Sequence, residues 1–298
     1  MKTVSVIIPT YKNRGGLTDS INSVLLQNCP NLVEVIVIDD NDPDSEFRRS
    51  TETIMKQYAS APIVKYICHE KNKNGAAARN TGIKASKGNY IAFLDDDDLF
   101  LPNKLSKQVE YLENHKEKDA VYCFAHRGKK VVSTIAYEGN GIRDILLLQS
   151  NYFTPSLMFR REALEAIEGF DESFYRHQDY DLMLRFFDSG FTIGCVTEVL
   201  VEIGLNQGEN IPNGEKLNQL KFDFFKKFNR YIEREDDLTP GFKNKVYAKH
   251  YAGVLLNHIK NRNFRMAINT LCEYLPKSPS PFLGVIWNSL VAHIKRDA

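Results

Sequence analysis

The first 125 residues alternate between short apolar runs and longer segments with helical spacing. The apolar runs cover residues 4–9, 33–38, 64–68, 90–94 and 120–125. The helical segments lie between them, at residues 16–27, 47–58, 76–85 and 103–114. Apolar strands joined by helices predict a mostly parallel sheet that is flanked by helices on both faces. This alternation therefore predicts an α/β fold, whose ligands bind outside the carboxyl ends of the strands.

The second half of the chain is less regular and ends in helices. Helical patterns appear at residues 142–148, 161–167 and 179–189, with one strand at residues 156–159. From about residue 215 onward the spacing is helical throughout. The turn-forming run NQGENIPNG precedes it. We expect one domain at residues 1–210 and a C-terminal helical extension at residues 211–298.

Charge and cysteine content exclude several classes of protein. The formal net charge of the 298 residues is +1, which gives no case for nucleic-acid binding. Residues 241–298 carry +7 and residues 1–240 carry −6, so a basic tail follows an acidic body. The five cysteines form no CxxC pair and predict neither a zinc site nor a disulfide framework. With no signal peptide and no apolar stretch of membrane-spanning length, we expect a cytoplasmic protein.

Four consecutive carboxylates follow the fourth predicted strand, in the run FLDDDDLFLP. Like charges so close repel each other unless a cation joins them, and oxygen ligands suit Mg²⁺ or Mn²⁺. Alternate residues of an extended chain face the same side, so Asp95 and Asp97 can point toward one ligand. The alternative is a solvated acidic loop, or a helix N-cap with Asp98 as the capping residue.

Two further carboxylates, Asp39 and Asp40, follow the second strand in VIVIDDNDPDS. A carboxylate at that place can accept hydrogen bonds from a nucleotide base and from ribose hydroxyls. The alternative is an Asx-turn with a helix cap at Asp44 or Ser45.

Two helices carry residues of catalytic type. Arg79 follows the Asn-Gly turn and the small residues of KNKNGAAARNTG, and its guanidinium is shaped to bind a diphosphate. The alternative is an ordinary surface arginine. Asp179 and Asp181 open a helix in GFDESFYRHQDYDLMLRF. One of them can serve as a general base, although the helix dipole alone also favours acidic residues there.

The order of these motifs is more specific than any one of them. SVIIPTYKN, VIDDND, the ARNTG–KGNYIAFLDDDD block and the GFDE–QDYDLMLR block together resemble the family 2 inverting glycosyltransferases of the GT-A fold, over residues 2–201. The resemblance implies a Rossmann-like sheet and a nucleotide pocket. The residues it implies for that pocket are Pro9, Thr10, Tyr11, Asp39, Asp40, Arg79, Asp95 and Asp96.

The resemblance also implies roles for individual side chains. Asp40 would hold the base with Asp39 beside it, and Arg79 would approach the donor diphosphate. Asp95 and Asp97 form the family's Asp-x-Asp, with Asp97 as the more direct metal ligand and Asp95 nearer the ribose. Asp179 matches the catalytic base. The chain departs from the family at one place, where Gln178 stands for the usual glutamate.

These roles imply a single displacement assisted by Mn²⁺ or Mg²⁺. A sugar moves from a nucleotide-diphosphate sugar, with a UDP-sugar favoured, to a hydroxyl of a glycan or lipid-linked acceptor in surface polysaccharide synthesis. One alternative is a nucleotidyltransferase, although only Gly15–Gly16 offers the early glycine-rich loop that such an enzyme needs. The other is a non-catalytic scaffold that binds a sugar nucleotide.

The end of the chain carries a last amphipathic segment at residues 282–296. Its apolar face consists of Leu283, Ile286, Trp287, Leu290, Val291 and Ile294. Lys295 and Arg296 follow. This helix either packs on the body or on a partner subunit, or lies on an anionic lipid surface at the inner face of the cell membrane. The helices predicted at residues 215–234 and 242–261 would shape the acceptor site or form a homodimer contact.

Overall fold

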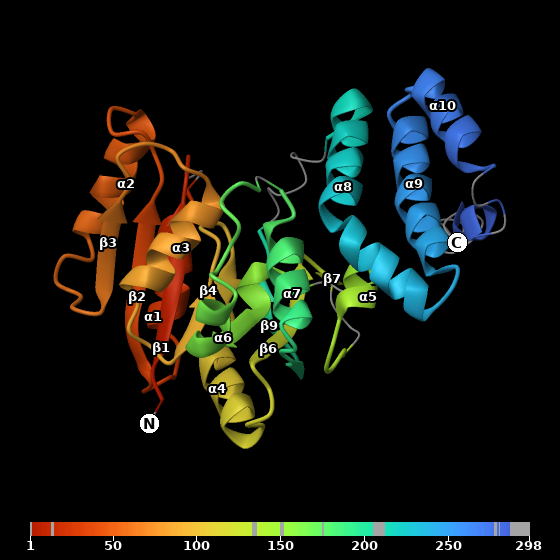
Figure 1. Ribbon diagram of the computed structural model, residues 1–298. Coiled ribbons are helices and arrows are strands. Elements are labelled where there is room, and N and C mark those ends of the chain that lie inside the picture. The colour runs from red at the N-terminus through yellow and green to blue at the C-terminus, as the bar shows by residue number, and fades with distance from the viewer. Residues whose placement is uncertain are drawn as a thin grey trace. The chain divides into compact units, whose positions relative to one another are not determined.

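The computed structural model describes residues 2–12, 15–132, 136–149, 152–174, 176–204, 212–276, 279 and 281–286. The chain divides into two compact units (Figure 1). Met1–Gly141 and Ser150–Asn206 form the first unit, and Ile142–Gln149 and Gln207–Ala298 form the second. The sequence analysis placed all of residues 1–210 in one domain, but Ile142–Gln149 belongs to the second unit because it packs on the helices there.

The first unit alternates strands and helices as the apolar runs predict. Its strands are β1 (Val4–Thr10), β2 (Leu32–Asp39), β3 (Val64–Cys68), β4 (Tyr90–Phe93), β5 (Leu99–Phe100), β6 (Ala120–Arg127), β7 (Lys130–Val131), β8 (Leu157–Arg160) and β9 (Ile193–Glu202). Its helices are α1 (Leu17–Leu25), α2 (Glu46–Lys56), α3 (Gly75–Ala85), α4 (Lys104–Asn114), α6 (Arg161–Ala166) and α7 (Gln178–Asp188), with a 3₁₀ turn at Thr154–Ser156.

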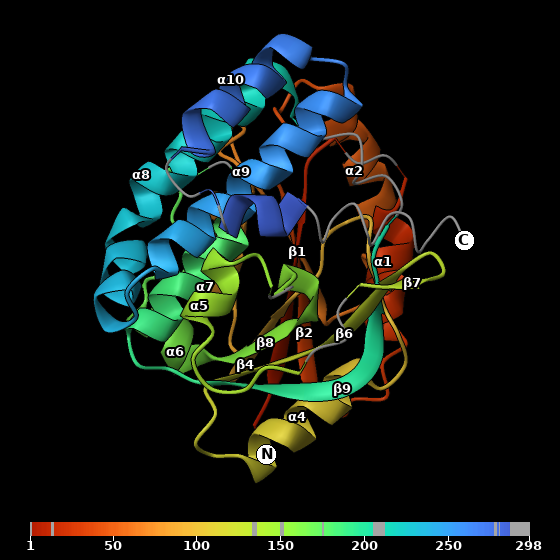
Figure 2. The ribbon, with the colours of Figure 1, turned by 90° about the vertical axis from the view of Figure 1, so that its right-hand side faces the viewer.

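The described strands form one sheet in the order β3-β2-β1-β4-β8-β6-β9-β5, with β7 paired to β6. The four strands from β3 to β4 are parallel, as the sequence predicts. The far half is mixed, because β8 runs antiparallel to both β4 and β6. Strand β9 returns parallel to β6 and curves along the sheet (Figure 2). No element was expected at residues 193–202, where β9 lies.

Alternating residues of β1 explain how helices cover both faces of the sheet. Val4, Val6 and Ile8 point into one core together with apolar residues of α1 and α4. Ile7 points to the other face, where a Cβ on Gly82 of α3 would collide with it. Helix α3 therefore lies close against β1 and β2 (Figure 1). This close approach brings the start of α3 to the carboxyl ends of both strands.

The second unit is helical. It contains α5 (Ile142–Leu146), α8 (Gly214–Leu238), α9 (Phe242–Lys260) and α10 (Phe264–Tyr274). The His250 imidazole of α9 is fully buried, and its Nε2 lies 2.9 Å from the Leu146 carbonyl oxygen of α5. Among the described residues, no helix combines the length and the apolar character needed to cross a membrane.

The predicted terminal helix falls only partly within the described residues. Residues 281–286 are helical, and residues 287–298, which carry Trp287 and the two basic residues, lie outside the described part of the chain. Phe282 is fully buried among Ala248, Ala252 and other small and apolar side chains, and Ile286 packs against this cluster. Leu283 is 53% exposed, so the inward face begins at Phe282 and not at Leu283.

Candidate functional site

A cavity of about 410 Å³ opens at the carboxyl ends of the parallel strands, where ligands bind in such sheets. Its lining comes from the ends of β1, β2 and β4 and from the turn that opens α3. The lining residues are Pro9, Thr10, Tyr11, Asp40, Asn72, Asn74, Gly75, Ala78, Arg79, Asp95, Asp96 and Asp97. The cavity therefore gathers most of the residues that the sequence predicts for a nucleotide pocket.

The acidic run is held by hydrogen bonds from several elements. The Thr10 hydroxyl donates to Asp96 Oδ2 over 2.5 Å. Asp98 is buried and accepts from the Gly204 amide at the end of β9. Asp98 does not cap the following helix, because α4 begins at Lys104 and its N-cap residue is Asn103, whose side chain makes no capping bond.

Two glycines lie in close contact with the backbone of the same acidic run. A Cβ on Gly16 would lie 2.5 Å from the carbonyl oxygen of Asp96, and one on Gly204 would collide with the carbonyl oxygen of Asp97. Backbone from the start of α1 and from the end of β9 therefore fits against the Asp96–Asp97 peptide. Only residues without a Cβ permit this approach without a shift.

Crowding of negative charge is visible in the ionisation of this run. Burial, together with the Asp95 and Asp97 carboxylates, raises the pKa of Asp96 to about 7, although the hydrogen bond from Thr10 lowers it. Burial also raises the pKa of Asp98, to about 8, with Asp95 contributing. A cation at this place would relieve the repulsion, so the donor set fits Mg²⁺ or Mn²⁺.

The described residues contain no group of three His, Cys, Asp or Glu side chains placed to hold a metal ion by themselves. Mg²⁺ commonly uses one or two carboxylates and takes its other ligands from water and from substrate phosphates. The acidic run therefore fits a metal that arrives with a diphosphate.

Asp40 and Asp39 face different surroundings, although they are adjacent. Asp40 lines the cavity, and its two oxygens accept from His69 Nδ1 at 2.6 Å, from Asn72 Nδ2 at 2.8 Å and from the amides of Lys73 and Asn74, each at 2.9 Å. These four bonds occupy the usual lone-pair positions of a carboxylate. Asp40 therefore organises the loop that carries Asn72 and Asn74 into the cavity wall.

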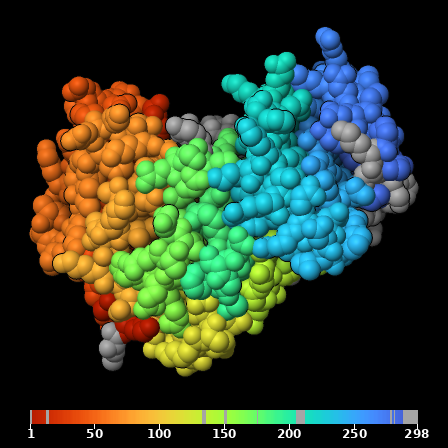
Figure 3. All heavy atoms as spheres, viewed as in Figure 1, coloured from red at the N-terminus to blue at the C-terminus, as the bar shows by residue number. Residues whose placement is uncertain are grey.

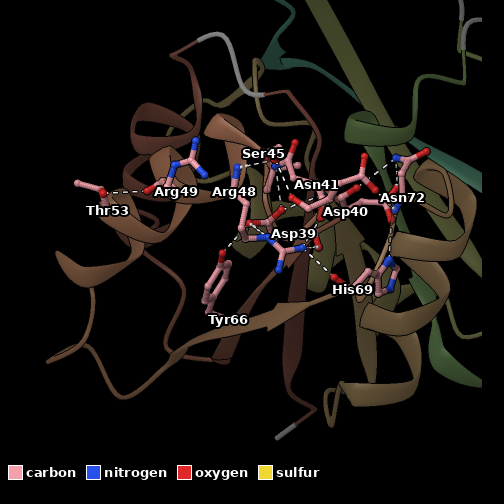
Figure 4. A network of polar contacts seen from close by, with 12 residues as sticks. Asp39, Asp40, Asn41, Ser45, Arg48, Arg49, Thr53, Tyr66, His69 and Asn72 are labelled. Carbon is pink, nitrogen blue, oxygen red and sulfur yellow. Dashed lines mark hydrogen bonds and ion pairs between the residues drawn. The ribbon is translucent and has the colours of Figure 1, made fainter.

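Asp39 is fully buried and does not line the cavity. It accepts from the Tyr66 hydroxyl at 2.5 Å and from the Asn41 amide, and its Oδ2 lies 3.0 Å from Nε of Arg48. Figure 4 shows Arg48 reaching from α2 toward the ends of β2 and β3. Its Nη2 donates to the carbonyl oxygens of Asp39, Asn41 and His69. This network supports the loop from beneath.

Sequence reasoning missed several members of this network. His69 directly follows β3, so the rule that polar residues gather at strand ends could have found it. Arg48 carries no such signal, because its place depends on how α2 returns over the loop. The helix cap that was the alternative interpretation of this segment is present together with the network. Ser45 caps α2 by accepting from the Arg48 amide at 3.1 Å.

Arg79 connects the acidic run to helix α7. Its Nη2 donates to Asp95 Oδ1 over 2.6 Å, and its Nη1 donates to Gln178 Oε1 over 3.1 Å. The guanidinium also lies over the Phe170 ring, 5.5 Å from its centroid. The Nε atom is buried without a partner among the described residues. Arg79 lines the cavity and keeps donors that these bonds do not use.

Asp179 stands beside Gln178 at the start of α7 and is partly exposed. Burial raises the pKa of its carboxyl to about 6, against the opposing effects of the Tyr180 amide and the Arg79 cation. The Asp95 carboxylate also contributes to this rise. Asp179 does not line the cavity, yet its carboxyl interacts electrostatically with Arg79 and Asp95, which do.

Asp181, the other carboxylate considered for the base, points elsewhere. It is buried and pairs with Arg185 one turn along α7, with Nε 2.8 Å from Oδ2. Arg185 in turn donates to the carbonyl oxygens of Ile167 and Gly169. Asp181 therefore orients an arginine that holds the preceding loop.

Known proteins resemble this chain over the same region. The sequence model of the family described as "Glycosyl transferase family 2" matches residues 5–182. An uncharacterized glycosyltransferase of Rickettsia bellii (strain RML369-C) is 46% identical over 115 residues, which are 38% of this chain and 15% of that protein. The uncharacterized glycosyltransferase RP339 of Rickettsia prowazekii (strain Madrid E) is 30% identical over 260 residues, which are 82% of this chain and 72% of that one.

A solved structure shares the fold. The crystal structure of S. aureus TarS 1-349 in complex with UDP-GlcNAc superposes with a TM-score of 0.67 and covers 95% of this chain and 84% of that one. The sequence identity is 19%, so this likeness concerns the fold alone. It covers the mixed sheet and its flanking helices.

Proposed function

Since this chain belongs to glycosyltransferase family 2, we propose that it transfers a sugar from a UDP-sugar to a hydroxyl of a glycan or lipid-linked acceptor, inverting the anomeric carbon. The observation that carries the proposal is the cavity where Asp40, Arg79 and the acidic run meet at the carboxyl ends of β1, β2 and β4. Family membership removes the nucleotidyltransferase alternative. The UDP preference draws support from the UDP-GlcNAc complex of TarS, a protein of the same fold.

The donor's nucleotide would occupy the part of the cavity between Tyr11 and the Asp40 loop. Tyr11 is 45% exposed, so its ring is available for contact with a base. The Asp40 carboxylate fixes the amides of Lys73 and Asn74, and Asn72 and Asn74 line the wall. We therefore assign Asp40 and Asp39 to shaping the nucleotide pocket through this loop, with Pro9 and Thr10 forming its floor.

The diphosphate would lie between Arg79 and the acidic run. Arg79 offers planar donors toward it, and Asp97 and Asp95 would hold Mg²⁺ or Mn²⁺. Such an ion neutralises the negative charge that develops on the leaving diphosphate. Asp96 is tied to Thr10 and keeps the run in place beside β1.

Asp179 would remove the proton from the acceptor hydroxyl as that oxygen attacks the anomeric carbon. The new C–O bond forms on the face opposite the bond to the diphosphate, which breaks in the same step. No covalent sugar–enzyme intermediate is needed, in contrast to retaining glycosidases. A pKa of about 6 leaves the carboxylate ionised at neutral pH and still basic enough to accept the proton. Burial thus suits Asp179 to this role.

Calorimetric titration of UDP, GDP and dTDP, each with and without Mn²⁺, tests the donor site. We expect UDP to bind most tightly and to need the metal. Failure of all three nucleotides in folded protein would contradict the proposal. Donor hydrolysis with and without metal then separates an active enzyme from a non-catalytic scaffold, which would bind UDP without turnover. An acceptor screen follows with the donor in hand.

A further inference from the structure

The helical unit contains a cavity of its own, of about 480 Å³. All its lining residues belong to α8, α9 and α10, which are seen together in Figure 2 and whose outer surface is coloured cyan to blue in Figure 3. They are Glu215, Asn218, Gln219, Phe222, Tyr251, Asn269, Thr270, Glu273 and Tyr274. None of the roles assigned above uses these residues.

Aromatic side chains from all three helices line this cavity. Tyr251 and Tyr274 stack with their ring centroids 3.3 Å apart, and Phe225 stacks behind Tyr251 at 5.2 Å. Phe225 is buried and anchors this stack in the core of the unit. Phe222 of α8 also lines the cavity and is 60% exposed. The stack is therefore a rigid aromatic floor, beside which Phe222 offers an open ring face.

Amides and a hydroxyl surround the aromatic rings. Asn218 Oδ1 accepts from Nε2 of His258 at 3.0 Å, and His258 is fully buried with Nδ1 unpaired among the described residues. Because an amide oxygen only accepts, Nε2 carries the proton, and burial lowers the pKa of this histidine. The bond fixes the orientation of the Asn218 amide. Its NH₂ group has no acceptor among the described residues and can donate to a ligand.

The other polar side chains add acceptors. Thr270 donates its hydroxyl proton to the Met266 carbonyl at 2.9 Å and so presents oxygen lone pairs. Gln219 donates through Nε2 to Asp223 at 2.9 Å, so the side-chain carbonyl oxygen of Gln219 can accept a hydrogen bond from a ligand. Asn269 is exposed on α10 and brings both a donor and an acceptor. The cavity therefore offers donors and acceptors side by side, as hydroxyl groups require.

The charge of the lining excludes an anionic occupant. Glu215 and Glu273 line the cavity, and no Lys or Arg of the described residues does. A phosphate or sulfate would meet two carboxylates and no cation. A wholly apolar ligand would leave the Asn218 NH₂ group and the Gln219 carbonyl oxygen, which accept or donate nothing among the described residues, without water or a ligand to bond. A neutral polyol avoids both problems, because it carries no negative charge and its hydroxyls can bond to the polar side chains.

We propose that this cavity binds a neutral oligosaccharide, whose sugar rings lie on Phe222 and the tyrosine floor and whose hydroxyls bond to the surrounding amides and carboxylates. The positive C–H edges of a pyranose suit the negative face of an aromatic ring. Such a site would bind a glycan chain through residues of the helical unit alone. The link between this binding and sugar transfer rests on the proposed function, whereas the binding itself does not.

The test compares two phenylalanines of equal exposure. Phe222 lines the cavity and Phe264 on α10 does not, and each is 60% exposed, so neither substitution should disturb folding. The full chain and its Phe222→Ala, Phe264→Ala and Asn269→Ala variants are titrated calorimetrically with maltotetraose, mannotetraose, cellotetraose and chitotetraose. A sulfated tetrasaccharide is the anionic control. Thermal unfolding of each variant is followed by circular dichroism.

We expect at least one neutral tetrasaccharide to bind the full chain and the Phe264→Ala variant alike. Phe222→Ala should weaken this binding about tenfold or more, and Asn269→Ala should weaken it less. Added UDP should not compete. The inference is overturned if no neutral tetrasaccharide binds, if only the sulfated one does, or if both phenylalanine variants lose binding equally. UDP titration of the same protein reports separately on the donor site, so either proposal can fail alone.

Discussion

The ion pair between Arg79 and Asp95 places Nη2 of the guanidinium 2.6 Å from Oδ1 of the carboxylate. The other terminal nitrogen of the same guanidinium binds Gln178, the residue before the proposed base. One side chain of α3 therefore joins the acidic run after β4 to the start of α7. In the proposed mechanism, this connection sets the relative positions of the donor diphosphate and the base.

Replacing Arg79 with glutamine should impair both binding and chemistry. Arg79→Gln removes a charge-assisted bond to Asp95 and a cation that faces the diphosphate. We expect kcat/KM to fall about 10- to 100-fold, because hydrogen bonds to charged groups contribute roughly 1.5–3 kcal/mol. Steady-state kinetics with varied donor measure this. Lys84→Gln, on the exposed side of the same helix, is the control and should retain activity.

Replacing Asp179 with asparagine should remove proton transfer and leave donor binding. General-base catalysis typically contributes about 10²–10⁴-fold, so the Asp179→Asn rate should fall by at least that order. UDP affinity should stay unchanged in calorimetry. Asp188→Asn, at the exposed far end of α7, should behave as the parent enzyme. A near-parental rate for Asp179→Asn would refute the assignment of the base.

The pH dependence of turnover should reflect the raised pKa of Asp179. The base works only when it is deprotonated, so kcat/KM should rise through about pH 6 and level off above it. Below that pH the rate should fall about tenfold per unit. Because the Arg79 cation lowers this pKa, Arg79→Gln should move the acid limb to higher pH. An acid limb near pH 4, the usual range for an aspartate, would contradict the effect of burial.

Removal of divalent metal should stop turnover if Asp97 and Asp95 hold the ion. We expect donor transfer to require added Mn²⁺ or Mg²⁺ after treatment with a chelator. Asp97→Ala should transfer equally slowly with and without metal. Asp44→Ala, an exposed carboxylate outside the cavity lining, should keep the full metal response. Equal parental rates in chelator and in Mn²⁺ would disprove metal dependence.

Arg48 and Arg49 allow a comparison of how much a buried and an exposed arginine of α2 contribute to the free energy of unfolding. Arg48 is 5% exposed and pairs with the fully buried Asp39. Arg49 is exposed, and its guanidinium donates to the Asp44 carbonyl at 2.8 Å. Arg48→Met leaves a buried carboxylate without its cation and should cost about 3–5 kcal/mol of unfolding free energy. Arg49→Met should cost far less. Urea unfolding of both variants decides, and equal losses would argue against the supporting role of the Asp39 network.

The parallel half of the fold could be predicted from sequence, since β1 to β4 are continuous apolar runs between amphipathic helices. Strand β9 could not, because its central residues are half-buried or exposed, and Thr197 and Glu198 interrupt its apolar run. The position of β8 between β4 and β6 depends on pairing between segments far apart in the chain. Local periodicity carries no information about such pairing.

The site residues also divide into those that the sequence predicts and those that it does not. The rule that ligands bind at strand ends gathers Thr10, Asp40 and the acidic run correctly around one cavity. It does not separate Asp39 from Asp40, because that depends on which of two neighbouring residues faces Arg48. The pairing of Gln178 with Arg79 joins residues 99 positions apart and left no local pattern to detect.

Gly16 and Gly204 have a consequence for interpreting related sequences. A chain with larger residues at these two places could retain every acidic residue of the run and still hold the Asp96–Asp97 peptide in another position. Counting carboxylates in an alignment would then classify an inactive protein as an enzyme. Under the proposed function, a search for active relatives should therefore ask for small residues at these two places as well as for the acidic motif.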